Sequence, residues 1–205
     1  HEKYPDAIIF INGSYYDENR RPTTAIWQDG KCINRKKGIL NKGALFSYTV
    51  ADNDKGTMDL IYLGEQPVDV TMVNYYSAIQ SMPTLIVNGR ITVKKSDWKA
   101  NRTVIAKDKN EYIYIIVSEG SLNYKSFSLY DMADWIIKNI PNIIIAVNLD
   151  GGYESQLSIN TEKLKYATLG QWETNDTGDI SKPGIKIKIP VAIGFFKKMF
   201  AKDVR

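Results

Sequence analysis

Short runs of β-branched and aromatic residues, separated by polar turns, dominate the hydrophobic pattern of the chain. Apolar runs of roughly four to eight residues between Gly, Asn, Asp or Pro clusters are typical of strands. We therefore predict strands over residues 7–11, 23–27, 31–34, 44–50, 58–63, 84–87, 91–93, 103–106, 112–117, 143–149, 156–159, 186–189 and 191–196. The clearest hairpin turns on Asn88-Gly89, because a type I′ turn needs two residues that tolerate a positive φ.

One segment, residues 128–139, has the periodicity of an amphipathic helix. Ser128 and Asp131 form a variant of the capping box, and Pro141 ends the helix. The apolar face consists of Leu129, Met132, Ala133, Ile136, Ile137 and Ile140. A second, short helix is predicted over residues 68–78, where apolar residues also recur at helical spacing.

The strand 112–117, the helix 128–139 and the strand 143–149 predict one strand-helix-strand crossover. Its two strands would be parallel and its connection right-handed. Ligands of such units tend to bind beyond the carboxyl ends of the strands, where Asn148 and Asp150 lie. Asp150-Gly151 alone is equally a hairpin-turn signal. The predicted fold class is α+β: a mixed, mostly antiparallel β-sheet with a few helices and this crossover.

Length and composition favour a single globular domain over residues 1–205, with a charged tail over 196–205. A long polar segment, 170–184, is typical of a lid or binding loop. At 43% hydrophobic and 24% charged residues, disorder is excluded, and no apolar run reaches the roughly 20 residues of a membrane span. No signal peptide is visible. The location is extracellular or in the cell envelope if one was removed, and otherwise cytoplasmic or phage-associated.

Charge and rare residues narrow the chemistry. The net charge of +4 and the scattered basic residues suit a small anionic substrate better than a nucleic-acid polymer. His1 is the only histidine and Cys32 the only cysteine, which excludes Ser-His-Asp, Cys-His and His-ligated zinc sites. Carboxylates and carbonyls could bind Ca²⁺, but no EF-hand spacing occurs, and we predict neither a catalytic metal nor a cofactor. The oligomeric state stays open.

Four motifs follow one another along the chain: INGSYYD, QSMPTLIVNGR, NRTVIAKD and NLDGGYES. The first and last share one form, in which an apolar strand ends in Asn, Gly, an aromatic residue and a carboxylate. Gln80 precedes Pro83, and no turn explains it. Arg102 could be a surface charge, yet its planar fork suits phosphate or carboxylate.

On these motifs the chain resembles the phosphodiester glycosidase family over most of residues 7–159. The family patterns are NGG followed by any residue, F and D; QxxPxLxxNG; RTxxG; and NLDGGGSS. The chain departs from them at Ser14, Tyr16, Ala106, Tyr153 and Glu154. Tyr153 adds bulk and Glu154 adds negative charge where the family usually has neither.

The resemblance implies hydrolysis at the anomeric carbon of a sugar 1-phosphodiester, which releases the sugar and a phosphomonoester. A phosphate leaves as a stabilised anion, so the reaction needs less general-acid help than ordinary glycoside hydrolysis. On this hypothesis Asp150 is the base, or the carboxylate that stabilises an oxocarbenium-like centre, and Glu154 or Asp17 is the second carboxylate. Arg102 holds the phosphate by a charge-assisted fork.

The remaining candidate residues would bind the substrate. Asn and Ser side chains hydrogen-bond sugar hydroxyls or phosphate oxygens, glycines allow close backbone approach, and Tyr15 or Tyr153 stacks on the sugar face. The predicted binding residues are Asn12, Gly13, Tyr15, Gln80, Arg102, Thr103, Asn148, Gly151, Gly152, Tyr153 and Ser155. The predicted partner is a phosphate-linked carbohydrate or another small anion.

Two other functions are open. The chain could be a non-catalytic module that binds glycans or anions, with a pocket reshaped by Tyr153 and Glu154. It could also be a structural component of a phage particle or a cell surface. Binding of sugar phosphates without product release would favour the first, and association with particles the second.

Overall fold

The structure is a computed structural model that describes residues 4, 6–34, 42–51, 56–64, 75–119, 127–170 and 188–197. These residues form three β-sheets, in which every pair of neighbouring strands is antiparallel, and one α-helix. The mostly antiparallel sheet structure is as predicted, whereas the described residues hold one α-helix and one short 3₁₀-helix, less helix than expected.

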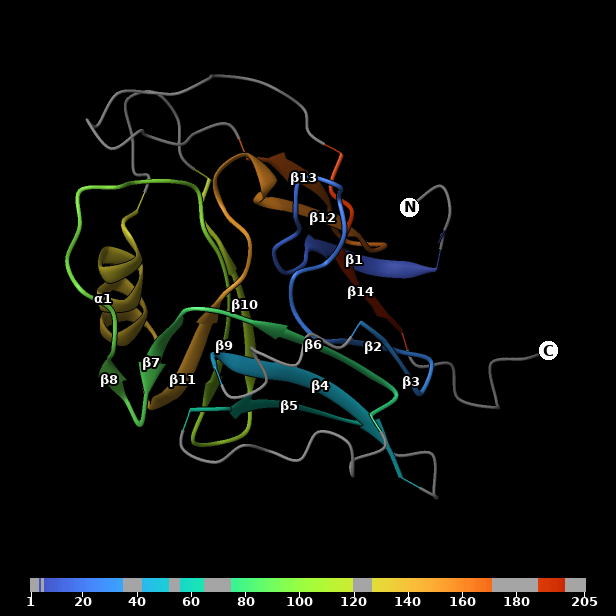
Figure 1. The fold of residues 1–205 in the computed structure, drawn as a ribbon, viewed down its shortest axis with the longest axis horizontal. Coiled ribbons are helices and arrows are strands. Elements are labelled where there is room, and N and C mark those ends of the chain that lie inside the picture. The colour runs from blue at the N-terminus through green and yellow to red at the C-terminus, as the bar shows by residue number, and fades with distance from the viewer. Residues whose placement is uncertain are drawn as a thin grey trace.

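Sheet II, as we call it, carries the helix and the predicted crossover (Figure 1). Its strands, in spatial order, are β10 (Ile113–Val117), β9 (Thr103–Asp108), β11 (Ile143–Asn148), β7 (Thr84–Val87) and β8 (Arg90–Ile91). Because β10 and β11 are both antiparallel to β9, they are parallel to each other, as predicted, with β9 inserted between them. Their carboxyl ends therefore meet the amino end of β9 at one edge of the sheet.

The helix α1 (Leu129–Asn139) begins and ends where the sequence predicts. Ser128 accepts a hydrogen bond from the Asp131 N–H, and the Asp131 side chain accepts one from the Ser128 N–H, which completes the capping box. The helix packs against β7, β8 and β11 and buries Met132 and Ile136 in a core beneath it. In β7–β8, Asn88 has φ 50° and Gly89 φ 72°, as the type I′ hairpin requires.

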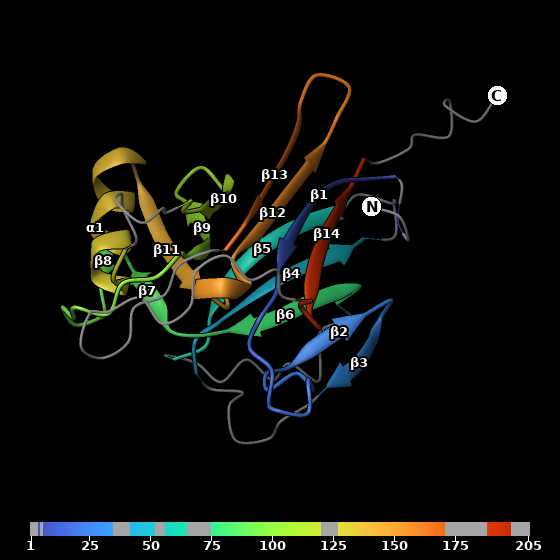
Figure 2. The same ribbon diagram turned by 90° about the horizontal axis from the view of Figure 1, so that it is seen from above.

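Sheet I contains the first and last described strands. Its order is β13 (Lys165–Leu169), β12 (Gln156–Asn160), β1 (Ala7–Asn12) and β14 (Ala192–Phe196). The β12–β13 hairpin projects beyond the neighbouring strands (Figure 2). β13 was not predicted, and residues 188 and 189, the described half of the predicted strand 186–189, are not in a strand. The polar segment 171–184 and residues 198–205 of the predicted tail lie outside the described residues.

Sheet III contains residues for which a helix was predicted. Its order is β3 (Lys31–Asn34), β2 (Ile26–Gln28), β6 (Ser77–Ser81), β4 (Ala44–Val50) and β5 (Gly56–Tyr62). The helix predicted over residues 68–78 is wrong at its described end, because Ser77 and Ala78 belong to β6. That strand is hydrogen-bonded to β2 and β4, and this pairing overrides the local helical spacing. Residues 65–74 lie outside the described part.

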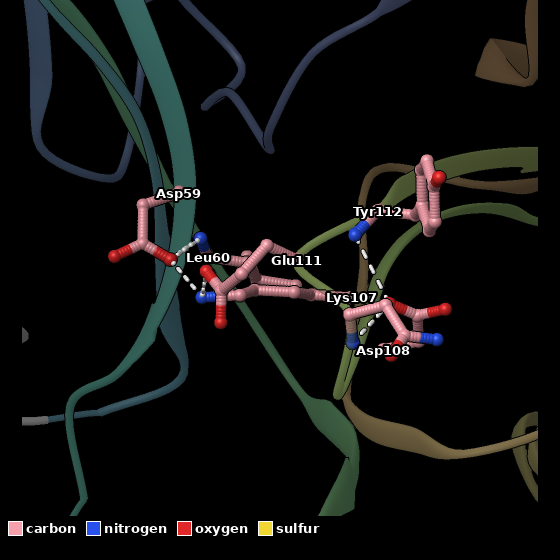
Figure 3. A network of polar contacts seen from close by, with 7 residues as sticks. Asp59, Leu60, Lys107, Asp108, Glu111 and Tyr112 are labelled. Atoms are coloured by element: carbon pink, nitrogen blue, oxygen red, sulfur yellow. Dashed lines mark hydrogen bonds and ion pairs between the residues drawn. The ribbon is translucent and has the colours of Figure 1, made fainter.

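A buried lysine joins sheets II and III. Lys107 on β9 is 8% exposed, and its Nζ lies 2.8 Å from Asp59 Oδ1 on β5 and 2.5 Å from Glu111 Oε2 (Figure 3). Burial lowers the pKa of Lys107, but the hydrogen bonds and charges of Asp59 and Glu111 outweigh burial and raise it on balance.

One hydrophobic core draws on all three sheets, with Ile11 from β1, Phe46 from β4 and Ile105 from β9 among its members. No helix among the described residues is long and apolar enough to cross a membrane.

Candidate functional site

Three chain segments meet at the edge of sheet II where β11 ends. The Leu149 N–H donates to the Thr103 carbonyl at 2.8 Å, and the Asp150 N–H donates to the Gly13 carbonyl at 3.1 Å. The loop after β1, the start of β9 and the end of β11 are thereby joined main chain to main chain. The Asn148 N–H also donates to the Pro83 carbonyl, at 3.0 Å, so all four sequence motifs converge at one place.

Asn12, Thr103 and Ser155 form a buried polar cluster beneath this edge, and each is at most 1% exposed. Asn12 Nδ2 donates to the Asp150 carbonyl at 2.8 Å, and Asn12 Oδ1 accepts from Thr103 Oγ1 at 2.7 Å and from the Gln156 N–H at 3.1 Å. Thr103 Oγ1 also lies 3.1 Å from Ser155 Oγ. These side chains fix the backbone of Asp150, and direct contact between them and substrate stays a prediction.

Asp150 and Arg102 lie on either side of Gly151. The Gly151 N–H donates to Asp150 Oδ1 at 2.9 Å, and a Cβ added to Gly151 would lie 3.5 Å from Arg102 Nη1. The guanidinium therefore lies in ordinary contact with the Gly151 position, and the tightest neighbour of a Cβ there would be the Asn101 carbonyl oxygen, at 3.0 Å. Arg102 is 8% exposed, and its Nε and Nη2 donate to the carbonyls of Phe127 and Trp98 at 2.9 and 3.2 Å. The fork is held in a fixed orientation, which a flexible surface arginine would lack.

Tyr15 and Asn148 form a second contact with this loop. Asn148 Nδ2 donates to Tyr15 Oη at 2.8 Å, whereas Asn148 Oδ1 is buried without a hydrogen-bond partner among the described residues. Burial, and next the charge of Asp150, raise the pKa of Tyr15 to about 12, against the opposing effects of Asn148 and Arg102. Tyr15 is therefore a neutral hydroxyl near Asp150, and its hydrogen can be donated to a further acceptor.

Glu154 reaches a different tyrosine. It lies on the 3₁₀-helix Gly152–Glu154, and its Oε1 accepts a hydrogen bond from Tyr16 Oη at 3.0 Å. Burial, then Glu154 and then Asp150, raise the pKa of Tyr16 to about 12. The charges of both carboxylates therefore act at this phenol. Asp17, the other candidate, instead accepts from the Arg21 N–H at 2.8 Å and closes its own turn.

Gln80 has a structural role that the sequence did not reveal. Its side chain is fully buried, accepts from the Ala25 N–H at 3.3 Å and donates to the Lys42 carbonyl at 2.8 Å. These bonds attach β6 to the segments beside it. Gly13 is confined by packing, because a Cβ there would lie 2.5 Å from Val191 Cγ1.

The 3₁₀-helix contains two further candidates. Tyr153 is 9% exposed, and its stacking on a sugar stays a prediction. Gly152 has φ 65°, which favours glycine at that turn.

Sequence reasoning missed three hydroxyl groups. Ser81 Oγ donates to the Asn148 carbonyl at 2.7 Å, and Ser118 Oγ accepts from the Arg102 N–H at 2.7 Å. The third is that of Tyr16. Ser81 and Tyr16 stood inside quoted motifs, so their positions were a usable signal, whereas nothing local distinguished Ser118.

Two surface hollows lie apart from these residues. One of about 710 Å³ lies between the loop at Lys95–Lys99 and the outer side of α1, and the other, of about 390 Å³, lies near the β7–β8 turn. No group of three or more His, Cys, Asp or Glu side chains suited to a metal occurs among the residues that the structure describes. The expected absence of a metal stays a prediction.

The chain was compared with models of known protein families, with curated proteins and with solved structures. The chain belongs to the phosphodiester glycosidase family, a family of glycosidases, because the family model matches residues 5–196. This confirms the resemblance drawn from the four motifs. No curated protein matches the chain.

One solved structure shows a similar fold. The zebrafish N-acetylglucosamine-1-phosphodiester alpha-N-acetylglucosaminidase catalytic domain, auto-inhibited by its pro-peptide, is 19% identical with a TM-score of 0.62. The match covers 94% of this chain and 62% of the zebrafish chain. A hypothetical protein from Synechocystis is 17% identical with a TM-score of 0.48, over 86% of this chain and 49% of that one. At 19% identity the likeness to the zebrafish structure concerns the fold alone.

Proposed function

We propose that the protein hydrolyses the glycosidic bond of a sugar 1-phosphodiester, or of a related phosphate-linked glycan or nucleotide sugar. The observation that supports this most is the placement of a fixed guanidinium, Arg102, against Gly151, the residue that follows Asp150. A cation next to a carboxylate suits a substrate whose anionic phosphate is attached to a carbon that becomes positive.

In the proposed reaction the bond between the anomeric carbon and the phosphate oxygen breaks, and the electron pair leaves with the phosphomonoester. The oxygen of one water molecule bonds to the anomeric carbon, and the water proton passes to a carboxylate and then to solvent. The Arg102 guanidinium, whose Nε and Nη2 donate to two backbone carbonyls, binds the phosphate by charge-assisted hydrogen bonds. Asp150 stabilises the oxocarbenium-like centre, because its neighbour Gly151 lies against the Arg102 side chain that would hold the departing phosphate.

Glu154 is the better second carboxylate. Its Oε1 accepts a hydrogen bond from Tyr16, and the charge of Asp150 also raises the pKa of this phenol. Asp17, in contrast, accepts a hydrogen bond from the Arg21 N–H in its own turn. We assign to Glu154 the activation of water. Tyr15 supplies a neutral hydroxyl for substrate groups beside Asp150, and Asn148 holds that hydroxyl in place through its Nδ2.

The test is product release by the purified protein from the 1-(methyl phosphates) of glucose and N-acetylglucosamine and from nucleotide sugars. Asp150→Asn keeps the side-chain shape and should lower kcat by about 10³-fold or more, since it removes the charge in the transition state. Its circular dichroism and melting temperature should match the wild type. Asp134→Asn, on the outer side of α1 where it pairs with Lys138, is the matched control.

Two outcomes would contradict the proposal. Undiminished turnover by Asp150→Asn would remove this residue from the mechanism. Binding of the sugar phosphates by the wild type, with no product over long incubation, would instead identify a non-catalytic binding module.

A further inference from the structure

The hydrogen bond between Tyr16 and Glu154 joins two segments that are 138 residues apart in the chain. Tyr16 follows β1 of sheet I, and Glu154 follows β11 of sheet II by way of Asp150. The donor is the phenolic hydroxyl and the acceptor is Glu154 Oε1, at 3.0 Å. This distance is ordinary for a hydrogen bond to a carboxylate, and both side chains are partly shielded from water.

Both partners stand on constrained backbone. Tyr16 is bridged to Pro22, and the Asp17 N–H donates to the Arg21 carbonyl at 2.9 Å, so the loop that carries Tyr16 is closed on itself. On the other side, the Glu154 N–H donates to the Gly151 carbonyl at 3.2 Å. The bond therefore connects two supports that are themselves held, and it restricts a glutamate side chain that otherwise rotates about three bonds.

The phenol can act only as a donor to this carboxylate. Its raised pKa, caused first by burial and next by Glu154 and Asp150, keeps the hydroxyl protonated, and Arg20 opposes this effect only weakly as the last of the causes. Since Oε1 receives the phenolic hydrogen, Oε2 is the oxygen left to accept a proton from water.

We infer that Tyr16 is a positioning residue that holds the carboxylate of Glu154 for water activation beside Asp150. The inference rests on the proposed function, in which Glu154 accepts the proton of the attacking water. Tyr16 itself touches neither the anomeric carbon nor the phosphate in this scheme. Its hydroxyl acts on the rate through Glu154, and substrate affinity depends little on it.

The test is Tyr16→Phe, which removes the hydroxyl and keeps the ring. We expect kcat to fall about 10- to 50-fold while KM changes by less than about twofold, as for a group that matters only in the transition state. Tyr112→Phe, at a side chain 66% exposed, is the matched control and should leave both constants unchanged. In a Glu154→Gln background, Tyr16→Phe should cause no further loss, because the group it positions is already gone.

The alternatives are distinguishable. The inference is overturned if Tyr16→Phe leaves kcat and KM unchanged, as the Tyr112→Phe control does. It is also overturned if Tyr16→Phe lowers kcat by the same factor in the Glu154→Gln background as in the wild type. In both cases the proposed function stands.

If the wild type releases no product from any probe, the proposed function fails. The contact between Tyr16 and Glu154 is then tested by urea unfolding of the wild type, Tyr16→Phe, Glu154→Gln and the double variant. Non-additive changes in stability would support Tyr16 as the residue that holds Glu154, and additive changes would overturn that too.

Discussion

Replacing Asn12 by alanine tests the buried cluster beneath Asp150 most directly. The substitution removes the donor to the Asp150 carbonyl and the acceptor shared by Thr103 Oγ1 and the Gln156 N–H. The Asp150 carbonyl and the Gln156 N–H each lose this hydrogen bond, whereas Thr103 still has Ser155 Oγ at 3.1 Å. Asn12 itself is 1% exposed, and these three hydrogen bonds contribute about 0.5–1.5 kcal/mol each, so we expect a loss of about 2–4 kcal/mol.

The assay is urea unfolding followed by tryptophan fluorescence, with thermal melting beside it. For a domain of this size the loss corresponds to a melting temperature lower by about 5–15 °C. Turnover should fall by more than about tenfold, because the Asp150 backbone is no longer held. Asn160→Ala, at the exposed end of β12, is the control. A loss for Asn12→Ala below about 0.5 kcal/mol would refute the view that this cluster supports the site.

Two further predictions concern charge. Tyr15 and Tyr16 have pKa values raised from 10.0 to about 12, so between pH 10 and 12 the unfolded chain releases protons that the folded protein keeps, and stability falls as pH rises through this window. Rapid pH-jump titration at 295 nm should show a component near 12 that Tyr15→Phe diminishes; its absence from the wild type would contradict the burial argument. Asp59→Asn should cost about 1–2 kcal/mol, since Lys107 keeps Glu111 but loses its partner across the sheets. An unchanged urea midpoint would show that the bridge contributes nothing.

Local chemistry explains why much of the fold could be predicted. The capping box at Ser128 and the Asn88-Gly89 turn each satisfy a requirement within a few residues, so the sequence contains the whole cause. The crossover was predictable too, because a helix between two apolar strands restricts their relative direction. The placement of β9 between those strands was not, since it depends on pairing with residues far along the chain.

The failures have the same origin. Among the described strands β13 pairs only with β12, and a short edge strand with mostly exposed residues has little hydrophobic pattern to detect. At Ser77 and Ala78 the spacing suggested a helix, but hydrogen bonds to two neighbouring strands decided the matter. Gln80 stood in a motif, yet its bonds go to backbone groups of remote residues, which no local pattern reveals.

The polar residues of the site divide into two layers with different tolerance to change. The inner layer, Asn12, Thr103 and Ser155, is buried and joins strand ends from two sheets, so a substitution there costs stability before it changes chemistry. Glu154 and Tyr16 in the outer layer are partly exposed and bonded to each other. The outer layer can therefore vary while the fold is kept. Both residues depart from the family pattern, so the features of this chain's substrate should be sought where these two side chains meet.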